Sequence, residues 1–133
     1  MRRIGNADMA LLEAARAAAG HAYCPYSGFP VGAAAECETG VHAGCNVENA
    51  SYSLGICAER VALQSAKAAG ARCITRLAVC CVNAVASDAE GKMPCGACRQ
   101  VIAEFMAPDA DVIIDGVGVW RVDELLPQAF RLT

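Results

Sequence analysis

The sequence has 133 residues and a formal net charge of −3, with 28 alanines and nine cysteines but only 5% aromatic residues. This length predicts one compact domain, residues 1–133, and the many small side chains favour helices packed closely against their neighbours. The 11 Lys and Arg residues are scattered without a run, and no segment approaches the roughly 18 consecutive apolar residues of a membrane span. We therefore expect a cytoplasmic protein that has neither a polymeric nucleic acid nor a membrane as partner.

The first part of the chain predicts a helix, a loop and a β-hairpin. Apolar residues recur at helical spacing over 7–19. The segment 23–30 contains two prolines and a glycine and is predicted to be a loop that presents aromatic side chains. Two short segments, 31–36 and 41–45, flank a turn at 38–40 and predict the hairpin.

Strands and helices alternate in the rest of the chain. The pattern predicts a helix over 57–69, a buried strand over 77–82, a helix over 96–106 ended by Pro108 and a buried strand over 112–114. One or two further helical turns are predicted within 122–130, ended or kinked at Pro127. This alternation after an opening hairpin predicts an α/β fold, a three-layer α/β/α domain with a mixed central sheet.

Three of the cysteines stand in two patterns, each at the predicted start of a helix. The patterns are Cys57-Ala58-Glu59 and Pro94-Cys95-Gly96-Ala97-Cys98. A helix N-terminus stabilises the thiolate, which is the form of cysteine that binds metal. The spacing of Cys95 and Cys98 directs both sulfurs to one point, whereas Cys57 must arrive from elsewhere in the fold.

Three thiolates and one open position describe a catalytic zinc site, which predicts one Zn²⁺ per chain. The open position would hold a water whose pKa falls to about 7, and Glu59 is near enough to accept its proton without ligating the metal. By itself Cys-x-x-Cys would also fit a redox dithiol or half of a zinc ribbon, but the ribbon needs a second such pair, which the sequence lacks. The other six cysteines are expected to pack as small apolar residues, with Cys45 as the one competing fourth ligand.

Three thiolates leave the site with a net negative charge, which weakens the metal as a Lewis acid. Arg60 and Arg99 each adjoin a site residue and are candidates to donate hydrogen bonds to the sulfurs. We favour Arg60, for which the alternative is an ordinary solvated helix arginine.

Several motifs in order along the chain resemble the small, homotetrameric cytidine deaminases. The resemblance runs from about Leu11 to Phe130 through Pro25-Tyr26-Ser27-x-Phe29, Gly44-Cys45-Asn46-Val47-Glu48-Asn49, Cys57-Ala58-Glu59-Arg60, Pro94-Cys95-Gly96-Ala97-Cys98-Arg99-Gln100 and Glu124-Leu125-Leu126-Pro127. It implies hydrolytic deamination of cytidine and deoxycytidine to uridine and deoxyuridine, with release of ammonia, as in pyrimidine salvage. It also implies zinc held by Cys57, Cys95 and Cys98, with Glu59 as the proton shuttle.

The resemblance further implies contacts with a nucleoside substrate. Asn46 and Glu48 would hydrogen-bond the ribose 3′-hydroxyl, Phe29 would pack against the nucleoside, and the Ala58 backbone would contact the pyrimidine carbonyl. Without the resemblance, Asn46 and Glu48 would equally fit turn chemistry, and Phe29 would fit a core aromatic.

Tyr52 and Phe130 match positions that reach into a neighbouring subunit's site. The resemblance therefore implies a homotetramer with shared active sites, and an inactive monomer. From the residue alone, Phe130 would also fit a core aromatic.

Two other functions stay open. One is deamination of a modified cytosine nucleoside of the blasticidin type. The motif Asn46-x-Glu48-Asn49 argues against it, because these residues favour an ordinary ribose. The other is a catalytically silent zinc-binding module, against which the intact Glu59 argues.

Overall fold

The computed structural model describes all 133 residues, and a five-stranded sheet lies at its centre. The strands are β1 (Val31–Cys37), β2 (Gly40–Cys45), β3 (Ile74–Cys81), β4 (Met106–Ile114) and β5 (Gly118–Arg121). Their order across the sheet is β2-β1-β3-β4-β5. Strands β3 and β4 pair in parallel and all other neighbours pair antiparallel, so the sheet is mixed, as predicted.

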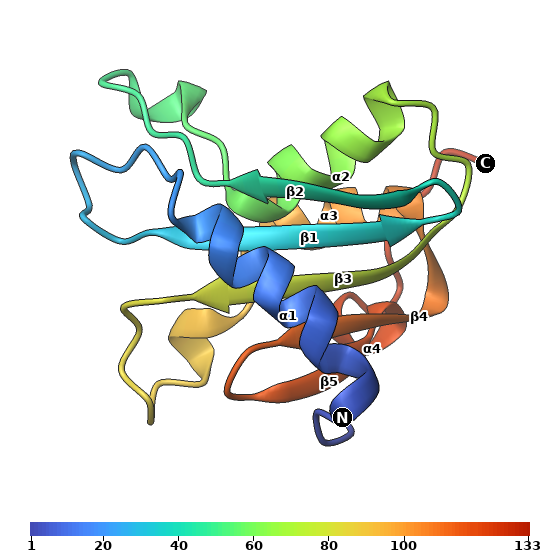
Figure 1. The fold of residues 1–133 in the computed structure, drawn as a ribbon. Helices are drawn as coiled ribbons and strands as arrows, with labels where there is room; N and C mark the ends of the chain where they lie inside the picture. Colours follow the sequence, from blue (N-terminus) through green and yellow to red (C-terminus); the bar gives the residue numbers. More distant parts are fainter.

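Helices cover both faces of this sheet. The α-helices are α1 (Asn6–Ala19), α2 (Ala58–Ala68), α3 (Gly96–Phe105) and α4 (Val122–Leu125), and two 3₁₀ helices are η1 (Tyr52–Leu54) and η2 (Glu90–Lys92). Helix α1 crosses one face, while α2 and α3 lie behind the other (Figure 1). The predicted three-layer α/β/α arrangement is therefore confirmed. None of the helices has the length and apolar character needed to cross a membrane.

Alternate residues of the central strands supply two separate cores, as strand geometry requires. Ala34, Ala78 and Ile113 face α1 and join the smaller core, and Ala33 and Leu77 face the other way into the larger core beneath α2 and α3. Both faces of the central strands are therefore apolar and buried.

Two glycines allow the helices to lie directly on the sheet. A Cβ on Gly32 would lie 1.8 Å from the carbonyl oxygen of Ala15 in α1, and a Cβ on Gly44 would lie 2.4 Å from the backbone nitrogen of Ala62 in α2. No side chain fits at either distance, so both helices pack backbone against strand. This is the close packing through small residues that the composition predicted.

The C-terminal third differs from the prediction in its boundaries. Helix α3 ends at Phe105 and β4 begins at the next residue, so Pro108 lies inside a strand predicted only over 112–114. Pairing with β3 skips from Met106 to Asp111, which leaves 107–110 outside the ladder, where a proline costs no hydrogen bond. Strand β5 was not predicted from the sequence, whereas the helical turn predicted within 122–130 is α4, which ends at Leu125, before Pro127.

A buried carboxylate ties the N-terminus to the sheet. Asp8 accepts two hydrogen bonds from Arg2, at 2.8 and 3.0 Å, and one of 2.8 Å from the Gly5 backbone, and Arg76 of β3 lies 3.4 Å away. The Arg2 hydrogen bonds outweigh the effect of burial and hold the pKa of Asp8 at about 2.

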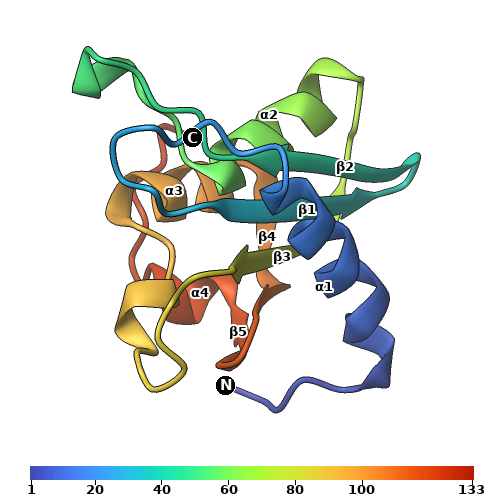
Figure 2. The ribbon, with the colours of Figure 1, turned by 60° about the vertical axis from the view of Figure 1, so that its left-hand side comes forward.

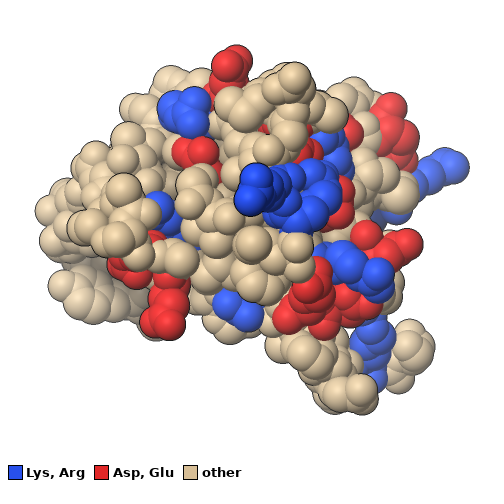
Figure 3. Space-filling model, turned by 90° about the horizontal axis from the view of Figure 1, so that it is seen from below, with Lys and Arg blue, Asp and Glu red and all other residues tan.

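On the side of the molecule shown in Figure 3, acidic and basic side chains are intermixed rather than gathered into patches of one sign.

Three loops gather at one end of the sheet. They are 22–30, which leads into β1, 46–56, which leaves β2, and 82–95, which leaves β3 (Figure 2). Helices α2 and α3 both begin at this end. The residues that precede these helices are consequently brought next to the loops.

Candidate active site

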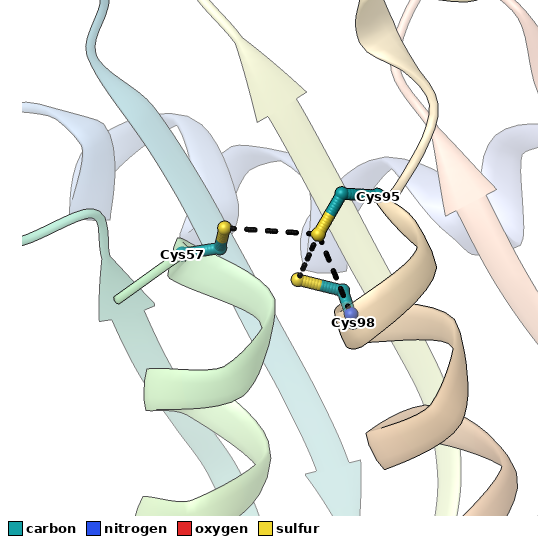
Figure 4. A group of neighbouring side chains, drawn as sticks. All are labelled: Cys57, Cys95 and Cys98. Carbon is teal, nitrogen blue, oxygen red and sulfur yellow. Dashed lines mark hydrogen bonds between the residues drawn. The ribbon is translucent and has the colours of Figure 1, made fainter. Parts of the chain in front are cut away.

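Three cysteine sulfurs meet where α2 and α3 begin (Figure 4). Cys57 is the N-cap of α2 and Cys95 is the N-cap of α3, and Cys98 lies in the first turn of α3. The Sγ atoms of Cys57 and Cys95 are 4.0 Å apart, those of Cys95 and Cys98 are 3.4 Å apart, and all three lie within 4.8 Å of one another. The structure thus brings Cys57 to the pair that the sequence placed together.

This donor set fits a zinc ion. Sulfurs bound tetrahedrally at a Zn–S distance of about 2.3 Å lie about 3.8 Å apart, close to the separations observed. Cys45 does not belong to the cluster, so the chain offers three cysteine ligands, and a tetrahedral ion held by them would keep its fourth position open. Cys98 is fully buried whereas Cys95 is exposed, so the cluster is accessible from one side.

The two candidate arginines do different things. Arg60 Nη2 donates a hydrogen bond of 3.5 Å to Cys57 Sγ, and the buried Arg60 Nε has no partner. Hydrogen bonds from the Cys98 thiol and from Arg60 hold the pKa of Cys57 well below its usual range, although burial opposes them. Arg99 donates none of its hydrogen bonds to sulfur. The structure therefore places Arg60, and not Arg99, where it can draw charge from the thiolates.

Glu59 lies in the first turn of α2, two residues after Cys57, and only 5% of its surface is exposed. Burial, assisted by the negative charge of Cys57, raises the pKa of Glu59 to about 7. A carboxyl group with this pKa exchanges protons readily at neutral pH, which is what a general acid and base requires.

A cleft of about 500 Å³ opens beside the cysteines. Among the residues predicted to form the site, those that line it are Phe29, Asn46, Glu48, Tyr52, Cys57, Ala58, Glu59, Arg60 and Cys95. Cys98 lies behind the wall, and Phe130 does not reach the cleft of its own chain. The only carboxyl groups in the lining are those of Glu48 and Glu59.

Asn46 holds the loop that enters β1. Its Oδ1 accepts a hydrogen bond from the Val31 backbone and its Nδ2 donates one to the Phe29 carbonyl, both at 2.9 Å. The turn chemistry considered from the sequence is therefore present. One amide N–H of Asn46 remains available to a ligand in the cleft.

Glu48 is held by the same loop. Its Oε1 accepts hydrogen bonds of 3.1 Å from the backbones of Tyr26 and Ser27, and its Oε2 accepts one from the Ser27 hydroxyl. The Ser27 hydroxyl is the main reason that the pKa of Glu48 is lowered. Glu48 is therefore an oriented, ionised acceptor at the cleft.

Tyr52 and Phe130 extend away from the core, with 79% and 68% of their surfaces exposed. The Tyr52 ring meets the Tyr26 ring edge to face, with centroids 5.9 Å apart. Phe130 is held through its backbone, because its carbonyl accepts a hydrogen bond of 3.1 Å from Gln100. Phe130 is not the core aromatic that its residue type alone would also fit.

Sequence reasoning missed two residues that shape the cleft. Ser27 orients Glu48, and its place in the Pro25-Tyr26-Ser27 motif was the available signal. Lys92 also lines the cleft and is almost completely buried, with Nζ 3.1 Å from the Ala86 carbonyl. Nothing in the sequence marked Lys92, because its burial depends on how the loop before α3 folds back.

Comparisons with known proteins agree with this geometry. Residues 6–114 match the family model of the cytidine and deoxycytidylate deaminase zinc-binding region. The chain is 44% identical over 126 residues to a cytidine deaminase of Sporosarcina psychrophila, with 90% of this chain and 88% of the relative covered. It is 46% identical over 121 residues to a cytidine deaminase of Mycobacterium tuberculosis strain H37Rv, with 90% and 85% covered.

Solved structures show the same likeness in three dimensions. The crystal structure of cytidine deaminase from Burkholderia pseudomallei superposes with a TM-score of 0.81 at 45% identity, covering 96% of this chain and all of the other. That of cytidine deaminase from Mycobacterium tuberculosis has a TM-score of 0.79 at 39% identity, covering 97% of this chain and all of the other.

Proposed function

The chain belongs to the cytidine and deoxycytidylate deaminase family, and from this premise we propose that it deaminates cytidine and deoxycytidine, with zinc held by Cys57, Cys95 and Cys98. The products are uridine or deoxyuridine and ammonia, as needed in pyrimidine salvage. The observation that carries the proposal is the meeting of three cysteine sulfurs with the buried Glu59 at one wall of a cleft of nucleoside size.

Glu59 moves the protons of the reaction. A zinc ion, when bound, supplies a water of lowered pKa, so that hydroxide is available at neutral pH. Glu59 would accept a proton from the attacking water and deliver it to N3 of the pyrimidine, while the hydroxyl adds to C4. Glu59 then takes the proton of the C4 hydroxyl and passes it to the amino group, so that the C4–N bond breaks, ammonia leaves and the C4 carbonyl of uridine forms. Arg60 offsets the negative charge of the thiolates through its hydrogen bond to Cys57.

Other residues that line the cleft hold the nucleoside. Glu48 accepts a hydrogen bond from the ribose 3′-hydroxyl, because it is an oriented carboxylate. Asn46 donates a hydrogen bond to the same hydroxyl, because one of its amide N–H groups is free. Phe29 packs against the nucleoside, and the Ala58 backbone, at the start of α2, contacts the pyrimidine carbonyl.

The complete enzyme is a homotetramer with shared active sites. Tyr52 and Phe130 support this, because both are large aromatic side chains that are exposed and do not pack into the core of their own chain. Sedimentation equilibrium of the purified protein tests the assembly. A protein that is monomeric at assay concentrations and fully active would contradict the shared site.

Three further features complete the proposal. Residues 1–133 act as one domain, and the substrate is a free nucleoside and not a polymeric nucleic acid. The protein works in the cytoplasm, where a reducing environment keeps its nine cysteines as free thiols and thiolates.

A substrate panel tests the function. Purified, zinc-loaded protein is incubated with cytidine, deoxycytidine, cytosine or blasticidin S while ultraviolet absorbance and ammonia release are followed. We expect turnover of cytidine and deoxycytidine. Turnover of blasticidin S alone would favour a deaminase of modified nucleosides, and no turnover with zinc present would favour a silent zinc-binding module.

A further inference from the structure

Arg99 follows the last of the three cysteines but faces away from them. Its Nε donates a hydrogen bond of 2.8 Å to the Pro94 carbonyl, the residue immediately before Cys95. Its backbone N–H donates one of 3.0 Å to the Cys95 carbonyl and so closes the first turn of α3. Arg99 therefore binds the carbonyl groups on both sides of the Cys95 Cα atom.

The same guanidinium reaches a second part of the chain. Arg99 Nη1 donates a hydrogen bond of 2.8 Å to the carbonyl of Leu125, the last residue of α4. A carbonyl at the end of a helix has no partner within that helix, and Leu125 is buried, so Arg99 satisfies a group that water reaches poorly. The planar guanidinium holds both carbonyls at a fixed separation, which a lysine cannot do.

The next residue continues this attachment. Gln100 Nε2 donates to the Phe130 carbonyl, so two consecutive residues of α3 hold the backbone at 125 and at 130. The C-terminal segment is thereby fastened to the helix that supplies two of the three sulfurs.

We propose that Arg99 is a positioning residue for the metal site, which braces the Cys95 sulfur by clamping the Pro94 carbonyl to the end of α4. The role differs from that of Arg60, which touches a sulfur directly. Cys95 is the most exposed of the three cysteines, and its sulfur accepts one hydrogen bond, of 3.4 Å, from the Cys98 backbone N–H. The position of the backbone before α3 therefore decides where this sulfur lies. Without the clamp, the loop before α3 gains freedom and Cys95 leaves the metal more often.

The inference rests on the proposed zinc site, so the test begins with the zinc content of the wild-type protein. Zinc-loaded wild type, Arg99→Met and Arg99→Lys are mixed with an excess of a colorimetric zinc chelator, and the rate of zinc release is measured well below the melting temperature of each. Arg121→Met is the matched control, because the Arg121 side chain pairs only with Asp123 at the surface. The visible absorption spectrum of each protein loaded with Co²⁺ reports the geometry of the sulfur ligands.

We expect Arg99→Met to release zinc at least tenfold faster than wild type and to change the Co²⁺ spectrum. Arg99→Lys should lie between the two, and Arg121→Met should stay within twofold of wild type. If Arg99→Met does not fold, Arg99→Lys decides, with an increase of at least threefold expected. Release and spectrum unchanged in the Arg99 variants, even with a lowered melting temperature, would show a merely structural role and overturn the inference. A wild-type protein that holds no zinc would instead overturn the proposed function.

Discussion

Replacing Glu59 by Gln removes the proposed proton shuttle with almost no change in shape. Glu59 is nearly completely buried at the wall of the cleft, and burial already favours the uncharged form of its carboxyl group. A neutral amide of the same size should therefore be accommodated, and the three cysteines stay in place. We expect Glu59→Gln to fold, to bind one zinc per chain and to lose most of its turnover.

The size of the loss follows from the lining of the cleft. A general acid and base contributes about 10²- to 10⁴-fold to the rate. The one other carboxyl group in the lining, Glu48, is already held by Tyr26 and Ser27, so it cannot replace Glu59. Because Glu59 serves more than one proton transfer, we expect a loss of at least about 10³-fold in kcat, equivalent to about 4 kcal/mol of transition-state stabilisation.

The assay follows the fall in ultraviolet absorbance of cytidine, with ammonia release as a second readout. Zinc content and melting temperature are measured on the same samples, so that loss of metal or of fold is separated from loss of chemistry. Glu104→Gln is the matched control, because Glu104 is exposed on α3, outside the cleft. A Glu59→Gln protein that carries its zinc and turns over within tenfold of wild type would refute the assigned role.

Three other substitutions test the surroundings of the site. Arg60→Met should lower kcat or zinc affinity by about 10- to 100-fold, because Cys57 loses a hydrogen bond, and steady-state kinetics with zinc titration will show which. Gly44→Ala should lower the free energy of unfolding by about 1–3 kcal/mol, measured in urea, because the new methyl group pushes α2 off the sheet; unchanged stability would contradict the packing described. Asp8 has a folded pKa of about 2 against 3.8 for the free group, so it contributes about 2 kcal/mol above pH 4 that is lost as the pH falls toward 2. Urea unfolding of wild type and Asp8→Asn at several pH values should show a fall that is larger in the wild type by about 2 kcal/mol, and equal falls would contradict the role of Asp8.

The three-cysteine cluster and the proposed proton shuttle, Glu59, could be predicted from the sequence because their signals are local. Cys95 and Cys98 are one helical turn apart, and Glu59 is two residues after Cys57, so each pair shares a helix start whatever the rest of the fold does. The three-layer fold was accessible for a similar reason, since the alternation of helices and strands restricts the possible architectures.

Strand boundaries in the C-terminal third were not accessible in this way. Strand β4 begins at Met106 because Met106 pairs with Ile74 of β3, after which the pairing skips 107–110. No local sequence pattern predicts such an interruption. Pro108 by itself predicts the end of a secondary-structure element. Only the position of β3 shows that the hydrogen-bonded pairing is interrupted at Pro108 while the strand continues.

The two arginines mark most clearly what the sequence determined and what only the tertiary structure decided. Residue types and spacing place Arg60 and Arg99 each beside a site residue, and they determine the chemistry that three thiolates and a glutamate can perform. Which arginine faces the sulfurs depends on how α2 and α3 are turned against each other and on where α4 ends. Those orientations depend on helices that pack on the sheet against residues far away in the sequence. Only the folded chain therefore distinguishes the arginine that contacts a cysteine sulfur from the arginine that holds the backbone around Cys95.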